Sequence, residues 1–217
     1  MHKLVLTFDD GPVLENTPRI LDTLAKYNVP ALFFVMGLQL TAPGALELVR
    51  RAAREGHLVG NHSFDHLDLT KCSPKEIRSQ ILRTHELISE FEPRRRLFRP
   101  PYGACNDAVN SIAKQLGYEV VFWNATAEDW RPENASSAWV KIAVEQVSAQ
   151  HVAVCLCHDR PHTAEYLPDF LERMRLLGSH EFVDYYHRRD LTALVNGARR
   201  RIRRWATSSR PPIKMAG

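Results

Sequence analysis

Near its N-terminus the chain reads Leu6-Thr7-Phe8-Asp9-Asp10-Gly11-Pro12, which places two adjacent carboxylates at the end of an apolar segment. The preceding leucines and valine favour a buried strand, and the Gly-Pro pair favours a turn that ends it. At a strand end the chain can direct both carboxylates into one pocket. Because like charges repel at that separation, the pair requires a metal ion, a proton or a cationic neighbour, unless it is only a solvated turn.

From this stretch onward, strand-like and helix-like segments alternate along the chain. Short apolar segments predict parallel strands at Lys3–Phe8, Ala31–Met36, Leu58–Gly60, Leu97–Phe98, Glu119–Trp123, Val152–Cys157 and, more weakly, Phe182–Tyr186. Apolar positions three and four residues apart predict helices at Thr17–Tyr27, Pro43–Glu55, Pro74–Phe91, Asp107–Leu116, Ser137–Val147 and Tyr166–Leu177, with one more helix before the tail. Repeated units of a strand followed by a helix predict an α/β fold with a parallel sheet, and six or seven such units predict a barrel.

Length and composition fit one domain, expected over residues 1–197, because 217 residues with 44% hydrophobic content can form a core. No segment approaches the roughly 18 consecutive apolar residues of a membrane span. The first strand follows Met1-His2-Lys3 directly, which leaves no room for a signal peptide. We therefore expect a cytoplasmic protein without stable membrane insertion, whose four cysteines are free thiols.

The positive charge of the chain is concentrated at its C-terminal end. Residues 198–217 contain no acidic residue and hold Arg199, Arg200, Arg201, Arg203, Arg204, Arg210 and Lys214. Without these side chains the net charge of +4 becomes negative, so the domain itself shows no basic face for nucleic acid. We expect residues 198–217 to form a basic, disordered tail, with contact to anionic lipid or nucleic acid as the alternative.

Polar side chains follow most of the expected strands, at the ends where a (β/α) barrel forms its site. Together they comprise Asp9, Asp10, His62, His66, Arg99, Tyr102, Asp129, Trp130, His158 and Asp159. His62 and His66 are four residues apart, so on a helical turn both rings could bind one metal ion, although this spacing alone is a weak signal. Adding one carboxylate of the Asp pair gives a catalytic type of metal site with open coordination positions. Zn²⁺ is the expected ion, with Co²⁺ or Ni²⁺ as alternatives.

Five of these segments resemble, in order, the motifs of the polysaccharide deacetylases, which are carbohydrate esterase family 4 with its NodB-homology domain. They are Thr7-Phe8-Asp9-Asp10-Gly11, His62-Ser63 with His66, Arg99-Pro100-Pro101-Tyr102, Asp129-Trp130 and Leu156-x-His158. The resemblance implies a distorted (β/α)7 barrel, and the chain looks most like the short NodB-type chitooligosaccharide deacetylases. Thr126 departs from the family pattern, which commonly has an extra Asp there. Arg160-Pro161-His162 matches no motif, and we expect substrate specificity to differ at this segment.

The resemblance also implies a role for each site residue. Asp10, His62 and His66 would hold the metal, Asp9 would be the general base, and Arg99 would keep Asp9 ionised. The backbone N–H of Tyr102 would stabilise the oxyanion, and His158, oriented by Asp129, would be the general acid. Residues of the acetyl-binding slot would be Tyr102, Trp130 and Leu156, with ordinary core packing as the alternative.

The expected function is metal-dependent removal of the N-acetyl group from a GlcNAc-containing chitooligosaccharide or polysaccharide, which releases acetate and a free amino sugar. An O-acetyl xylan esterase and an N-formyl amino-sugar deformylase are alternatives on the same scaffold. A third alternative is an inactive barrel that only binds carbohydrate. The expected partner is an N-acetylated oligosaccharide rather than a nucleic acid, and the sequence leaves the oligomeric state open.

Overall fold

The structure is a computed structural model that describes residues 2–186. The expected last helix and the basic tail lie outside these residues, as does the end of the domain expected at residue 197. No helix within the described range is long and apolar enough to cross a membrane. The expectation of a cytoplasmic location stays a prediction.

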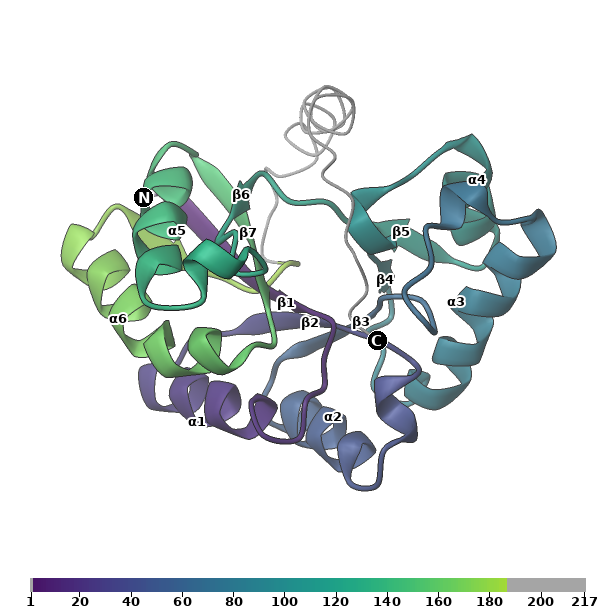
Figure 1. Cartoon of the computed structure of the whole chain (residues 1–217), viewed down its shortest axis with the longest axis horizontal. Helices are drawn as coiled ribbons and strands as arrows, with labels where there is room; N and C mark the ends of the chain where they lie inside the picture. Colours follow the sequence, from purple (N-terminus) through teal and green to yellow (C-terminus); the bar gives the residue numbers. More distant parts are fainter. Residues whose placement is uncertain (1, 187–217) are drawn as a thin grey trace.

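One eight-stranded sheet forms the centre of the molecule (Figure 1). Its strands are β1 (His2–Asp9), β2 (Ala31–Val35), β3 (Leu58–Asn61), β4 (Arg96–Phe98), β5 (Tyr118–Val120), β6 (Ala125–Thr126), β7 (Val152–His158) and β8 (His180–Phe182). Their order is β5-β4-β3-β2-β1-β7-β6, and β8 pairs with the start of β1. The strand pairs are all parallel, as the alternation of strands and helices predicted.

Within residues 2–186, six α-helices cover the outer side of this curved sheet (Figure 1). They are α1 (Thr17–Tyr27), α2 (Ala45–Arg54), α3 (Pro74–Ile88), α4 (Asp107–Gln115), α5 (Ala138–Ser148) and α6 (Pro161–Leu177). Among the described residues the edge strands β5 and β6 do not pair, so the sheet is a half-barrel with an opening between them. These strands have only three and two residues, which gives them few backbone groups with which to close the barrel. The predicted α/β class and distorted barrel are confirmed in this open form.

Side chains of β1 alternate between the two faces of the sheet, and this alternation positions the site. Leu4, Leu6 and Phe8 pack outward in a core with α1, α5 and α6. Val5 packs in the inner cluster, so Thr7 and Asp9, which share its parity, also point inward. Burial of each large apolar side chain stabilises the fold by about 1.5–3 kcal/mol, and this fixes the face on which Asp9 lies.

The neighbouring strand β7 follows the same alternation. Cys155 and Cys157 lie in the outer core, whereas Val154 lies in the inner cluster. His158 is therefore on the inner face, and the register pairs it with Asp9 of β1. All four cysteines are free thiols, as the sequence predicted.

Several predicted boundaries were wrong, including the end of α3, which is Ile88 rather than Phe91. The helix expected from Tyr166 begins at Pro161, because proline at a first helical position needs no hydrogen-bonded N–H. The strand expected over Glu119–Trp123 ends at Val120, and the chain returns to the sheet as β6. The last strand is His180–Phe182 rather than Phe182–Tyr186, because it pairs with the first residues of β1.

Candidate metal and acid–base site

Asp10, His62 and His66 come together at the carboxyl ends of β1 and β3. One ligand atom from each residue lies within 4.8 Å of the other two. The Nε2 atoms of His62 and His66 lie 3.4 and 3.2 Å from Oδ1 of Asp10. The three residues predicted as metal ligands therefore form one cluster.

The two histidines lie on an irregular loop, and the expected helical turn was wrong. Ser63 and His66 both have left-handed backbone conformations, with φ of 67° and 61°. These turns bring the imidazole rings to a centroid separation of 5.0 Å. Non-glycine residues adopt such angles only where the surrounding structure holds them, which is typical of functional sites.

The cluster fits a divalent metal ion. Oδ1 of Asp10 is buried and makes no hydrogen bond, although it faces both imidazoles. Nδ1 of His62 lies 2.7 Å from the backbone oxygen of Arg99, which can only accept, so Nδ1 carries a proton and Nε2 is the ring atom that would bind a metal. Burial acts to raise the pKa of Asp10, but the two imidazoles hold it well below its usual range. Two imidazoles and a carboxylate suit Zn²⁺ and similar ions and leave positions open.

Asp9 is paired with the buried guanidinium of Arg99. Nη1 of Arg99 donates to Oδ1 of Asp9 at 2.7 Å and lies 2.8 Å from Oγ1 of Thr7. The guanidinium is fully buried and lies over the ring of Phe34. Its charge compensates that of Asp9, which is 2% exposed. Oδ2 of Asp9 is 3.8 Å from Nε2 of His62, so this carboxylate borders the metal cluster.

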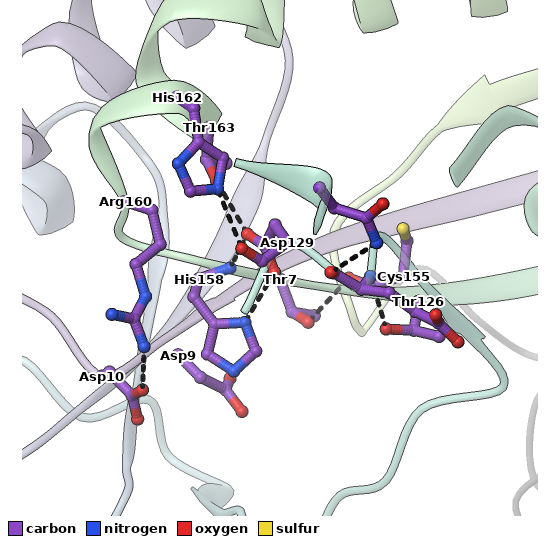
Figure 2. Close-up of polar contacts among 12 residues, drawn as sticks. Thr7, Asp9, Asp10, Thr126, Asp129, Cys155, His158, Arg160, His162 and Thr163 are labelled. Atoms are coloured by element: carbon purple, nitrogen blue, oxygen red, sulfur yellow. Dashed lines mark hydrogen bonds and ion pairs between the residues drawn. The ribbon is translucent and has the colours of Figure 1, made fainter. Parts of the chain in front are cut away.

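His158 and Asp129 form a second charged pair beside Asp9 (Figure 2). Nδ1 of His158 lies 2.7 Å from one oxygen of Asp129, and the backbone N–H of His158 donates to the other at 2.7 Å. Burial acts to lower the pKa of His158, but the hydrogen bond and charge of Asp129 raise it above its ordinary value. The pair therefore holds a proton on an imidazole next to the metal cluster.

With this geometry established, comparison with known proteins identifies the family. The family model described as polysaccharide deacetylase matches residues 2–121. The chain belongs to the polysaccharide deacetylase family.

Relatives within this family are named as deacetylases of peptidoglycan or of chitooligosaccharides. A peptidoglycan-N-acetylglucosamine deacetylase of Listeria monocytogenes is 39% identical over 186 residues, which cover 83% of this chain and 37% of the relative. A chitooligosaccharide deacetylase of Rhizobium leguminosarum bv. trifolii is 38% identical over 161 residues, which cover 73% of this chain and 72% of the relative. The chain thus spans little more than a third of the Listeria protein and most of the Rhizobium protein.

Solved structures support the same family. The peptidoglycan deacetylase PdaC of Bacillus subtilis superposes with a TM-score of 0.75 and is 31% identical in sequence. The match covers 96% of this chain and 98% of that structure. The half-barrel described above is therefore the fold of a polysaccharide deacetylase.

Tyr102, Trp130 and Leu156 are the remaining site residues that the sequence predicted. The ring of Tyr102 lies edge-on to His66 with a centroid distance of 4.5 Å, and Tyr102 is 58% exposed. Trp130 lies edge-on to His158 with a centroid distance of 5.3 Å. Leu156 is buried on the inner side of β7, opposite Thr7. The structure places all three near the site, and their role in binding an acetyl group stays a prediction.

Two supporting residues of the family site were missed in the sequence. Oγ1 of Thr163 donates to Asp129 at 2.7 Å, and Nε2 of His162 lies 2.8 Å from the backbone oxygen of Asp129. Both are in the first turn of α6 (Figure 2). The helix-start signal of Pro161 could have indicated that these side chains lie near the strand ends.

Asp159 was named in the sequence but given no role. One oxygen of its carboxylate accepts from the hydroxyl of Thr17 and, at 3.2 Å, from the backbone N–H of Val13. Its own N–H donates to the backbone oxygen of Asp9 at 3.2 Å. Burial raises the pKa of Asp159 to about 6. Asp159 therefore fixes the turn that carries the two adjacent carboxylates.

Proposed function

We propose that the protein is a metal-dependent deacetylase that hydrolyses the N-acetyl group of a GlcNAc-containing oligosaccharide or polysaccharide. The products are acetate and a free amino sugar. The observation that carries the proposal is that the metal-ligand cluster, the Asp9–Arg99 pair and the His158–Asp129 pair meet at one edge of the sheet. Family membership and the names of the relatives support the same reaction.

Asp10, His62 and His66 would hold the metal ion. A divalent ion there supplies a Lewis acid that polarises an amide carbonyl and makes water more acidic. Asp9 borders this cluster and would accept the proton that the attacking water loses. The guanidinium of Arg99 would orient the Asp9 carboxylate through the hydrogen bond to Oδ1, which leaves Oδ2 facing the cluster.

His158 would donate a proton to the departing nitrogen. An amine is a poor leaving group until it is protonated, so the reaction requires an acid at this point. The raised pKa of His158, caused by Asp129 against the opposing effect of burial, favours the protonated imidazole near neutral pH. The backbone N–H of Tyr102 would stabilise the oxyanion, while Tyr102, Trp130 and Leu156 would line the acetyl slot.

Two alternatives use the same residues on other acyl groups. An O-acetyl esterase would release acetate from an ester, and a deformylase would release formate from an N-formyl sugar. An inactive carbohydrate-binding protein is less well supported, because every expected ligand and both acid–base residues are in place.

The test is release of acetate from chitooligosaccharides by the zinc-loaded protein, with O-acetyl xylan and an N-formyl sugar as competing substrates. We expect acetate from the N-acetyl substrate, loss of activity on chelation, and recovery when Zn²⁺ or Co²⁺ is added. Conversion of only the ester or only the formamide would favour the corresponding alternative. Full activity of Asp10→Ala would contradict the metal assignment.

A further inference from the structure

Arg160 places an exposed guanidinium at the rim of the candidate site. It directly precedes α6, two residues after His158, and its side chain extends beside His158 toward Asp10 (Figure 2). Nη2 of Arg160 is 3.9 Å from Oδ2 of Asp10, the carboxylate oxygen opposite the one that faces the two histidines. The side chain of Arg160 is 46% exposed, so the guanidinium borders both the metal cluster and solvent.

The contact with Asp10 does not engage this guanidinium strongly. An ion pair at 3.9 Å with this exposure contributes little, because water screens it. A divalent cation at Asp10 would also repel the positive charge of Arg160. Arg99 differs from Arg160, because its guanidinium is fully buried and donates hydrogen bonds to Asp9 and Thr7. Arg99 is a fixed internal partner, whereas Arg160 has donors available for a ligand.

The backbone at Arg160 is held in place, which gives its side chain a fixed origin. Its N–H donates to the backbone oxygen of His158 at 2.9 Å. Pro161 follows with a restricted φ, and His162 bonds to the backbone of Asp129. The first turn of α6 contains no acidic residue, so the positive end of the helix dipole adds to the positive potential at this point.

We propose that Arg160 is a specificity-determining residue that binds a carboxylate carried by the glycan next to the acetamido group under attack. This inference rests on the proposed deacetylase function. A planar guanidinium pairs with a carboxylate through two parallel hydrogen bonds, which neutral sugar hydroxyls do not offer. Because Arg160 contacts the same Asp10 that would bind the metal, the carboxylate must lie on the reacting sugar or on the sugar directly linked to it.

The test compares two glycans that differ only at the lactyl group, which is a charged carboxylate in one and a neutral amide in the other. The first is a strand of alternating N-acetylglucosamine and N-acetylmuramic acid with free lactyl carboxylates, and the second is the same strand with those carboxylates converted to primary amides. Acetate release by the zinc-loaded full chain gives kcat and KM for each, and mass spectrometry identifies the deacetylated sugar. Chitotetraose is the neutral reference substrate.

We expect the wild-type protein to prefer the carboxylate strand over the amide strand by about ten-fold in kcat/KM, mainly through KM. Arg160→Gln should remove this preference, and Arg160→Lys should retain part of it, because a lysine keeps the charge without the planar geometry. The wild-type preference should weaken as salt is raised. Arg173→Gln is the matched control, since Arg173 lies on the same helix, is 53% exposed and pairs with Asp169 away from the site.

Equal kcat/KM for the two strands, or a preference that survives in Arg160→Gln, would overturn the inference while leaving the deacetylase function intact. A preference that Arg173→Gln removes as fully as Arg160→Gln would also overturn it. If wild type releases no acetate from either strand or from chitotetraose, the proposed function fails and the inference fails with it. Thermal melting of each variant establishes that the compared proteins are folded.

Discussion

The adjacent residues Asp9 and Asp10 serve different partners because their backbones differ. Asp9 is in the extended conformation of β1 and points inward to Arg99. Asp10 has φ of 71°, a left-handed conformation that turns its carboxylate back to the same side of the sheet. One carboxylate is therefore paired with a guanidinium, and the other faces the two imidazoles with which it would hold a metal ion, so the two carboxylates have separate positive partners.

The role of Asp10 as a metal ligand predicts that Asp10→Asn weakens zinc binding by at least about 100-fold. Substitution of a residue that only supports a metal ligand already lowers metal affinity by about 10–100-fold. Titration calorimetry with Zn²⁺ measures the affinity directly. Asp22→Asn is the control, since Asp22 is exposed on α1 and pairs with Arg51. Unchanged zinc affinity in Asp10→Asn would exclude Asp10 as a ligand.

The His158–Asp129 pair predicts a pH dependence. The carboxylate of Asp129 raises the pKa of His158 against the effect of burial, so the acid form persists as pH rises toward that pKa and is lost above it. Asp129→Asn should lower the pKa of His158 and move the alkaline limb of the kcat profile to lower pH. The pH profile and NMR titration of the His158 ring measure the two effects.

The control for this experiment is Asp169→Asn, which removes an exposed carboxylate from α6 without touching His158. An alkaline limb at the same pH in wild type and Asp129→Asn would contradict the role of Asp129. Thr163 would still bond to an asparagine oxygen at this position, so the local backbone is expected to persist.

At the level of single residues the sequence predicted which side chains gather at the strand ends, but not how they meet. Asp9, Asp10 and His158 could be identified because each follows an apolar strand. The loop from His62 to His66 could not be predicted, because its left-handed turns occur at Ser63 and His66 rather than at glycines. The contact of Thr163 with Asp129 depends on packing between segments that are distant in sequence.

Among the elements, β3 is tied to the rest of the fold by a buried polar network. Nδ2 of Asn61, at the end of β3, lies 3.2 Å from the hydroxyl of Tyr118, which donates to Glu92. Nδ1 of His85 lies 2.6 Å from the same glutamate, whose side chain is 1% exposed. Burial and the charge of Glu92 raise the pKa of Tyr118 well above its usual value, so the phenol stays protonated. The metal-ligand loop begins at the residue after Asn61.

Removing this hydroxyl in Tyr118→Phe should lower the free energy of unfolding by about 1–3 kcal/mol, because the buried carboxylate of Glu92 loses a donor. Urea denaturation monitored by circular dichroism measures the change. Tyr166→Phe on α6 removes a hydroxyl whose partner is the exposed side chain of Glu165, and it should change stability little. Equal stability of wild type and Tyr118→Phe would show that the hydroxyl contributes nothing to the network.

The elements themselves could be predicted where local signals are strong. Helix α3 begins at Pro74 as expected, and a capping box stabilises this start, since the side chains of Ser73 and Glu76 each bond to the backbone of the other. The start of α6 was missed because its first turn is polar and lacks the apolar periodicity of its later residues. Strand β6 was missed because two residues give no periodic signal, and only pairing with β7 defines it.

On the scale of the whole molecule, the site does not require a closed barrel. Its residues come from β1 and β7 and from the loops after β1, β3, β4 and β6, so the ends of the central strands position the metal cluster. The sequence predicted repeated strand–helix units, but not that the sheet stays open between β5 and β6. Closure depends on how many residues the edge strands can pair, which local patterns do not reveal.

Because Asp10 follows β1 and both histidines follow β3, the metal cluster exists only in the folded chain, and metal binding should therefore stabilise the fold. Zinc at 100 times its dissociation constant adds about 2.7 kcal/mol. For a domain of this size that corresponds to a Tm increase of roughly 5–10 °C. Differential scanning calorimetry of the chelated and zinc-loaded protein measures the shift, and Asp10→Asn should abolish most of it. An identical Tm with and without zinc would mean that folding and metal binding are not linked at these residues.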